Sequence, residues 1–204
     1  HDNQEAVTGA EFIILAVKPW LIKPVLRELK LKSKQILVSV AAGIPFEELA
    51  HYVADKEMIM FRIIPNTAIS ELESMTLIAS RNATKDQEQL MLDIFNQMGL
   101  AMLIPEEKFA AATSMASCGI AYVMKYIQAA MQAGIEMGIY PQDGMRMVAQ
   151  SLRGAAELIL NNDTHPSVEI DKVCTPGGIT IKGINQLEHD GFSSAVINAI
   201  KASK

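Results

Sequence analysis

Short runs of consecutive apolar residues alternate with amphipathic segments through the first half of the chain. The runs are rich in β-branched side chains and end at proline, glycine or polar residues, which is typical of buried strands. They predict strands at residues 12–17, 35–40, 58–64, 75–80 and 101–104. Apolar residues at helical spacing predict helices at 20–30, 45–53 and 83–98. Strands that alternate with helices in this way indicate an α/β unit with a largely parallel sheet.

After Pro105 the pattern changes and no further strand is predicted. Residues 106–138 have the pattern of one long helix or of two abutting helices. Further helices are predicted at residues 141–161, 165–172, 179–189 and 192–203. We therefore predict an α/β fold followed by an all-α part, with the boundary between residues 1–105 and 106–204.

The stretch 109–124 carries no charged residue and is bracketed by Glu107, Lys108 and Lys125. It is shorter than the roughly 20 residues that a membrane-spanning helix needs. A helix that is apolar on all sides must nevertheless be covered on all sides. The other predicted helices are too few to cover it, so we expect a second copy of the chain to do so. The alternative is a buried core helix in a monomer.

Composition excludes several classes of protein. Hydrophobic residues make up 50% of the 204 residues and charged residues 20%, which indicates a folded globular chain. A formal charge of −5 argues against nucleic acid as a partner. Cys118 and Cys174 are too few for a disulfide framework and lack zinc-site spacing, so we expect no metal and a cytoplasmic protein.

The chain begins at His1 rather than at methionine, and its first apolar run already predicts a buried strand. We therefore expect an N-terminal segment to be missing or undescribed. The alternative is a tag residue followed by a small domain that starts there. No G-x-G-x-x-G or P-loop pattern occurs, so the phosphate-binding turn of any dinucleotide site would lie upstream of His1.

In open α/β sheets, ligands bind at the carboxyl ends of the strands. Three segments follow predicted strands there, at residues 16–19, 41–43 and 65–67. Each is also a common strand-to-turn sequence. A second candidate is the segment 174–180, in which Gly177 and Gly178 precede a predicted helix. Bare N–H groups at that helix start could bind a small carboxylate, although a capped helix without a ligand explains the pattern equally well.

Other polar clusters favour structural roles. The segment from Asp163 to Pro166 could place a carboxylate and an imidazole near a site, but it has the composition of a turn before a helix. The stretch 18–34 holds six lysines or arginines against Glu28, which fits a solvated helix face better than a phosphate site. Neither cluster changes the two candidates above.

Taken together, these segments resemble pyrroline-5-carboxylate reductases, the family that makes proline from its cyclic imine. Residues 2–7 and 13–19 look like the second half of that family's cofactor domain, and residues 62–67 are similar to its R-x-x-P-N-T segment. Residues 173–183, with Pro176-Gly177-Gly178 and Thr180, look like its C-terminal signature. The resemblance implies a partial Rossmann-type parallel sheet, the remainder of a dinucleotide-binding domain, followed by a helical dimerisation and substrate domain.

The resemblance also implies a reaction, the reduction of 1-pyrroline-5-carboxylate to L-proline with NADPH or NADH. The implied cofactor-binding residues are Asn3, Ala16, Lys18, Pro19 and Asn66. The implied substrate-binding residues are Asp163, Thr175, Gly177, Gly178, Ile179 and Thr180. Thr180 would be the catalytic hydroxyl nearest the imine nitrogen, and Asp163 an electrostatic helper. The implied assembly is a homodimer or a higher homo-oligomer, with neither nucleic acid nor membrane as a partner.

Two other functions stay open on the sequence. A related hydroxy-acid dehydrogenase would need an acid–base group in the second half, where Lys125, Lys172 and Lys182 are available. A paralogue, or a truncated piece, could instead serve as a dimeric scaffold without turnover. Because the glycine-rich turn is missing, we expect the 204 residues to be inactive by themselves.

Overall fold

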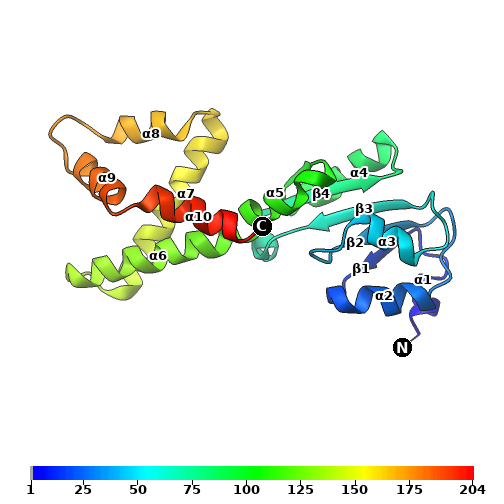
Figure 1. Ribbon diagram of the computed structural model, residues 1–204. Helices are drawn as coiled ribbons and strands as arrows, with labels where there is room; N and C mark the ends of the chain where they lie inside the picture. The colour runs from blue at the N-terminus through cyan, green and yellow to red at the C-terminus, as the bar shows by residue number, and fades with distance from the viewer. Residues whose placement is uncertain (1) are drawn as a thin grey trace. The chain divides into compact units, whose positions relative to one another are not determined.

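The computed structural model describes residues 2–204, which divide into two compact units (Figure 1). The first unit contains residues 2–120 together with Lys204, and the second contains residues 121–203. The first unit extends past the predicted boundary at residue 105 because helix α5 (Phe109–Ala116) packs against strand β4 (Ser74–Arg81).

The first unit is built on a five-stranded sheet in the order β1-β2-β3-β4-β5. All neighbouring strands are parallel except β3 and β4, which confirms the largely parallel sheet. The other strands are β1 (Phe12–Leu15), β2 (Ile36–Ser39), β3 (Ile59–Ile64) and β5 (Gly99–Leu103). The carboxyl ends of β1, β2 and β3 therefore meet at one edge, which we call the rim and define as residues 16–19, 40–43 and 65–67.

Each face of the sheet is covered by helices that bury an apolar stripe. On one face, α2 (Pro19–Glu28) contributes Ile22 and Leu26 to a core that also contains side chains of α3 (Phe46–Tyr52) and α5. On the other face, α4 (Lys85–Asn96) contributes Met91 to a second core over β2 to β5. These cores confirm that the periodic segments of the first half are an α/β unit.

One prediction for the first unit needs correction, and two short elements were missed. The run 12–17 was expected to be a buried strand, but β1 ends at Leu15 and Ile14 is 62% exposed. The reason is that β1 lies at one edge of the sheet, whereas α4 packs against β4 and β5 near the opposite edge. Helix α4 therefore does not cover Ile14. Two short elements were also missed, α1 (Asn3–Val7) and the 3₁₀ helix η1 (Thr67–Glu71), because neither is long enough to show a period.

The stretch expected as one long helix or two abutting helices consists of separate helices. A 3₁₀ turn, η2 (Glu106–Lys108), leads into α5, and after a break at Ser117 and Cys118 the chain continues as α6 (Gly119–Glu136). The remaining helices lie close to the predicted ranges, and α9 matches its range: α7 (Pro141–Asn162), α8 (Pro166–Val173), α9 (Ile179–His189) and α10 (Phe192–Ala202). Pro141 and Pro166 each occupy the first position of a helix. Proline is tolerated there because the N–H group that it lacks would have no partner within the helix.

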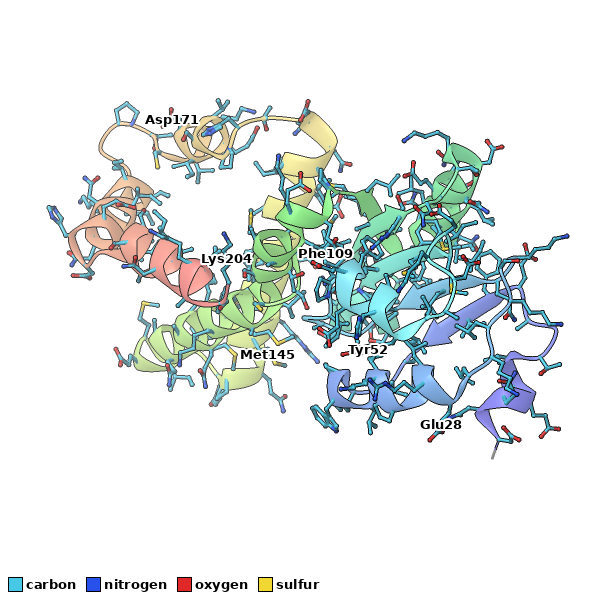
Figure 2. All side chains as sticks on the ribbon, turned by 45° about the vertical axis from the view of Figure 1, so that its right-hand side comes forward. Glu28, Tyr52, Phe109, Met145, Asp171 and Lys204 are labelled. Atoms are coloured by element: carbon cyan, nitrogen blue, oxygen red, sulfur yellow. The ribbon has the colours of Figure 1, made fainter. Side chains whose placement is uncertain are left out.

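The second unit has no apolar interior of its own. Within residues 121–203, all of which the structure describes, only Gly134 and Gly144 are buried. Large apolar side chains are exposed instead, including Met145 of α7, which is labelled in Figure 2 and is 47% exposed. Among residues 2–204, no helix has the length and apolar character needed to cross a bilayer.

Candidate active site

The rim carries small and basic groups beyond β1 and β2. Ala16 and Lys18 are exposed, and Lys18 is the N-cap residue of α2. The exposure of Lys18 leaves its ammonium group accessible to an anionic ligand. Pro19 opens the helix. Gly43 has φ +79° and no atom lies within 4 Å of the position a Cβ would take there, so this part of the rim is open.

Asn66 lies where β3 leaves the sheet, and its side chain is occupied at both ends. The Asn66 Oδ1 accepts from the main-chain N–H of Ala68 at 3.0 Å, while Nδ2 donates to the carbonyl of Ala116 at 3.1 Å. Its own main-chain N–H donates to the hydroxyl of Ser74 at 3.1 Å. Asn66 is only 8% exposed, so these bonds hold it in one orientation.

Asn3 is not grouped with the other predicted cofactor residues. It opens α1 and is exposed, and its neighbour Gln4 accepts a hydrogen bond from the main-chain N–H of Lys30 at 2.7 Å. Lys30 follows the C-terminal end of α2, whereas Lys18 precedes its N-terminal end. The structure thus brings Ala16, Lys18, Pro19 and Asn66 to the rim, with Asn3 elsewhere in the unit.

The glycine pair forms a tight turn in front of α9. Gly177 has φ +73°, and the N–H of Gly178 donates to the carbonyl of Thr175 at 2.9 Å. A Cβ on Gly178 would lie 2.7 Å from the Thr175 Oγ1 and 3.0 Å from its carbonyl oxygen, so glycine is needed there for space. No side chain caps α9, and the first N–H groups of a helix have no partner within it. The turn therefore presents free donors, and Ile179 beside them is 85% exposed.

Thr180 lines a hollow of about 610 Å³ in the second unit. The hollow lies among α6, α7, α8 and α9, and its walls are mostly apolar. Its few polar side chains are Tyr126, Ser151, Glu169 and Thr180. A hydroxyl among aliphatic side chains can orient a small ligand by hydrogen bonding in a mostly apolar pocket.

Polar side chains of the turn between α7 and α8 form hydrogen bonds with the first residues of α8. Asp163 ends α7 in the left-handed conformation, and the His165 Nδ1 accepts from the main-chain N–H of Ser167 at 3.2 Å. Thr164 donates its hydroxyl to Glu169 at 2.7 Å. His165 is thus a helix cap, in agreement with the structural interpretation of this turn, and Asp163 is exposed.

Glu169 is stabilised as a carboxylate by two neighbours. A hydrogen bond from the Lys172 ammonium at 2.7 Å and the bond from Thr164 lower the pKa of Glu169 below its usual value. A lowered pKa in the folded state adds stability above the unfolded pKa of about 4.3, and this stability is lost as the pH falls through the folded value.

We therefore expect wild type to melt at a higher temperature than Glu169→Gln at pH 7, because only the carboxylate pairs with Lys172. The difference in melting temperature should shrink toward pH 3, because the wild-type carboxyl takes up a proton as the pH falls through its lowered pKa. Differential scanning calorimetry at both pH values checks this. An equal gap at pH 7 and pH 3 would show that Glu169 acts through packing instead of charge.

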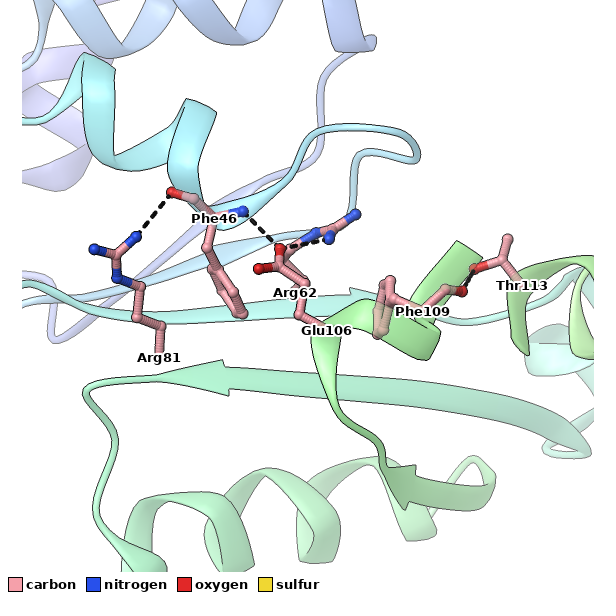
Figure 3. Close-up of polar contacts among 6 residues, drawn as sticks. All are labelled: Phe46, Arg62, Arg81, Glu106, Phe109 and Thr113. Atoms are coloured by element: carbon pink, nitrogen blue, oxygen red, sulfur yellow. Dashed lines mark hydrogen bonds and ion pairs between the residues drawn. The ribbon is translucent and has the colours of Figure 1, made fainter. Parts of the chain in front are cut away.

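An ion pair made by a buried arginine was not anticipated from the sequence. Arg62 of β3 is 7% exposed, and its Nη1 contacts the Glu106 Oε1 at 2.7 Å (Figure 3). The same oxygen accepts the main-chain N–H of Phe46 at 2.7 Å. The guanidinium lies 4.7 Å from the ring centre of Phe109. Arg62 and Asn66 both belong to the R-x-x-P-N-T segment, so the segment itself was the available signal.

Comparisons with known proteins agree with this arrangement of elements. Residues 106–204 match the family model "Pyrroline-5-carboxylate reductase dimerisation", and residues 1–43 match the model "NADP oxidoreductase coenzyme F420-dependent". Pyrroline-5-carboxylate reductase 1 of Dictyostelium discoideum is 38% identical over 98% of this chain, which spans 39% of that protein. Pyrroline-5-carboxylate reductase 2 of the same organism is 37% identical over 99% of this chain, which spans 73% of that protein. The chain belongs to the pyrroline-5-carboxylate reductase family.

A solved structure extends the agreement to the fold. Pyrroline carboxylate reductase from Plasmodium falciparum, with NADP bound, superposes with a TM-score of 0.91 and 29% identity, covering 100% of this chain and 78% of that one. The fold class is thereby confirmed. It is a mostly parallel Rossmann-type sheet followed by a helical part, which is the part that matches the dimerisation model of the pyrroline-5-carboxylate reductase family.

The residues of this family member fit one end of a nicotinamide dinucleotide. The rim offers an exposed cation at Lys18 and an open, glycine-bearing turn at residues 41–43. A G-x-G-x-x-G turn for the pyrophosphate does not occur in the 204 residues. No cluster of three or more metal-ligating side chains occurs among residues 2–204 either.

Proposed function

We propose that the protein reduces 1-pyrroline-5-carboxylate to L-proline, the last step of proline biosynthesis, with NADPH or NADH as the reductant. The observation that carries the proposal is the 37% identity to a pyrroline-5-carboxylate reductase of which this chain spans 73%. The uncapped start of α9 supports it independently, because the substrate carries a carboxylate that free N–H groups at a helix start can bind.

The substrate carboxylate binds at the start of α9. The N–H groups of the first turn and the positive end of the helix dipole favour an anion there. Thr175 shapes the turn by accepting the N–H of Gly178, and Gly177 supplies the positive φ. Ile179 leaves its N–H accessible at the first helical position. Asp163 supplies a negative charge that favours the protonated imine.

The Thr180 hydroxyl contacts the imine nitrogen. Nicotinamide supplies a hydride to the C=N carbon, and the electron pair of the C=N π bond becomes the nitrogen lone pair. The iminium N–H proton stays on nitrogen, so the product is a secondary amine and atoms balance. Thr180 Oγ1 accepts that N–H and thereby orients the C=N plane for attack. A protonated imine is already a good hydride acceptor, so no histidine or cysteine nucleophile is required.

Thr180→Ala should lower kcat by about 10²-fold, because the hydroxyl that orients the iminium for hydride attack is lost. Thr180→Ser is the matched control, since it keeps the hydroxyl and removes only a methyl group, and it should stay within a few-fold of wild type. Steady-state kinetics with 1-pyrroline-5-carboxylate measure both. Equal kcat values for Thr180→Ala and wild type would remove this hydroxyl from the mechanism.

Ala16, Lys18 and Pro19 lie along the cofactor at the rim, with Asn66 near the nicotinamide. Asn3, the remaining implied cofactor residue, lies in α1 and away from the rim. Lys18 offers its ammonium group to an anionic part of the cofactor, and Ala16 leaves space for a planar ring. Oxidation of NADPH and NADH by the natural protein, with 1-pyrroline-5-carboxylate against a panel of 2-keto acids, tests the whole assignment. Activity on the keto acids alone would identify a hydroxy-acid dehydrogenase, and activity on none would identify a scaffold.

The protein forms a homodimer or a larger homo-oligomer through its helical part. A compact 22.3 kDa protein exposes about 9,400 Å², and two separate compact bodies of the same total mass expose roughly 11,000 Å². This chain exposes 13,659 Å², and the large exposed side chains of residues 121–203 include Val123 and Met124. The free thiols of Cys118 and Cys174 support a reducing, cytoplasmic location.

Sedimentation velocity at micromolar concentration should therefore show a species of at least twice the 22.3 kDa chain mass. Replacing Met124, which is 61% exposed, by glutamate should shift the distribution toward monomer, because a buried unpaired charge is costly. Lys125→Gln beside it changes the net charge by the same one unit and is the control for charge alone. A monomer in the wild-type protein would contradict association.

A further inference from the structure

Both polar atoms of the Asn66 side chain form hydrogen bonds with main-chain groups of the protein. Its amide nitrogen donates to the carbonyl of Ala116, the last residue of α5, and its carbonyl accepts from Ala68. The last carbonyls of a helix have no partner within the helix, so this bond satisfies one of them. Asn66 is fixed in turn by Ser74, whose hydroxyl also hydrogen-bonds Thr76 at 3.0 Å, both residues being buried.

Arg62 contacts the other end of α5. Its guanidinium pairs with Glu106 of η2, directly before α5, and lies over the ring of Phe109, the first residue of α5. Arg62 is 7% exposed and Phe109 is 2% exposed, so this contact is part of the core. The two ends of α5 therefore contact two residues, Arg62 and Asn66, of one segment at the C-terminal end of β3.

The spacing of these two contacts matches the length of the helix. Arg62 and Asn66 are four residues apart in extended chain, which spans about 13 Å at 3.3 Å per residue. Phe109 and Ala116 are seven residues apart in a helix, which spans about 10 Å at 1.5 Å per residue. One extended segment can therefore reach both ends of α5.

We propose that the R-x-x-P-N-T segment is a two-point clamp on α5, in which Arg62 holds the start of the helix and Asn66 holds its end. Asn66 is then a positioning residue: its side chain fixes the break at Ser117 and Cys118, where α5 gives way to α6. α6 is the helix through which the chain passes from the sheet unit into residues 121–203. A second consequence rests on the proposed function, namely that turnover depends on the fixed end of α5.

Hydrogen exchange of the natural protein without substrate or cofactor tests the clamp directly. The main-chain N–H groups of Ser117 and Cys118 both donate to the carbonyl of Thr113, so they report on the end of α5. Asn66→Asp keeps the acceptor for Ala68 but places an oxygen against the Ala116 carbonyl. These two amides should then exchange about tenfold faster, the factor expected for one lost hydrogen bond. Unchanged exchange would overturn the clamp whatever the protein catalyses.

Asn82→Asp is the matched control. The Asn82 amide also donates to main-chain carbonyls, those of Met58 at 3.2 Å and Lys56 at 3.3 Å, and the substitution adds the same charge. It should leave the exchange of Ser117 and Cys118 unchanged. Acceleration in both variants would trace the effect to charge or global stability and overturn the clamp.

Steady-state kinetics separate positioning from direct contact with the cofactor. Asn66→Asp should lower kcat about tenfold while the KM for the nicotinamide cofactor stays within twofold of wild type. A tenfold rise in that KM with unchanged kcat would instead mean that the amide touches the cofactor, and it would overturn the positioning role. If no imine reduction is detected in wild type, the proposed function fails, and the exchange measurement still decides the clamp.

Discussion

Gly178→Val is expected to abolish imine reduction while the sheet unit stays folded. The Cβ of the new side chain would lie 2.7 Å from the Thr175 Oγ1 and 3.0 Å from the Thr175 carbonyl oxygen. Real Cβ atoms essentially never lie 2.7 Å from another atom, and 3.0 Å is tighter than most real contacts, so the Thr175 side chain and the main chain of the turn must shift. That shift displaces the first-turn N–H groups that we propose bind the substrate carboxylate. The measurement is the rate of NADPH oxidation with 1-pyrroline-5-carboxylate.

The effect at Gly178 comes from space and not from backbone strain, because its φ is −66°. This distinction supplies the control. Gly183 lies in the same helix with no atom within 4 Å of its Cβ position, so Gly183→Ala should keep the activity. Circular dichroism of both variants should match wild type. Wild-type activity in Gly178→Val would mean that the turn takes no part in substrate binding.

The second large effect concerns the ion pair in Figure 3 and is one of stability. Glu106→Ala should lower the free energy of unfolding by about 3 kcal/mol, because it leaves the Arg62 guanidinium buried without a counter-ion. The substitution also removes the acceptor for the N–H of Phe46. Urea denaturation followed by far-UV circular dichroism measures the change.

Two further variants show whether charge burial is the cause. Arg62→Met should cost less than Glu106→Ala, because the Glu106 side chain is 34% exposed and can be solvated when its partner is gone. Combining the two changes should recover part of the loss, since no uncompensated charge then remains. Glu107→Ala, on the exposed neighbour, should stay within about 0.5 kcal/mol of wild type. Additive losses in the double variant would argue against a coupled pair.

Elements with strong periodicity and clear end signals were predictable from the sequence. Helix α9 agrees with its predicted range because a glycine pair precedes it and Asp190-Gly191 follows it. Helix α1 was missed because it spans five residues and buries only Val7, which is too little for a period to appear. The break between α5 and α6 was left open because no proline marks it.

The candidate site was predictable only where it is local in sequence. The turn at Gly177 and Gly178 is made by adjacent residues, so spacing alone pointed to it. The bond between Arg62 and Glu106 joins residues 44 apart, and the bond between Asn66 and Ala116 joins residues 50 apart. Contacts at that separation depend on how α5 folds back onto the sheet, which no local pattern specifies. Arg62 therefore went unnoticed as a buried charge.

The lack of an interior in residues 121–203 has a thermodynamic consequence. A region that buries apolar surface only against another molecule gains its folding free energy from association, so its stability varies with the logarithm of protein concentration. The sheet unit, with Phe61 and Ile63 fully buried, carries its stability within one chain. On the association that we propose, dilution should therefore unfold the C-terminal helices first and leave the sheet unit folded.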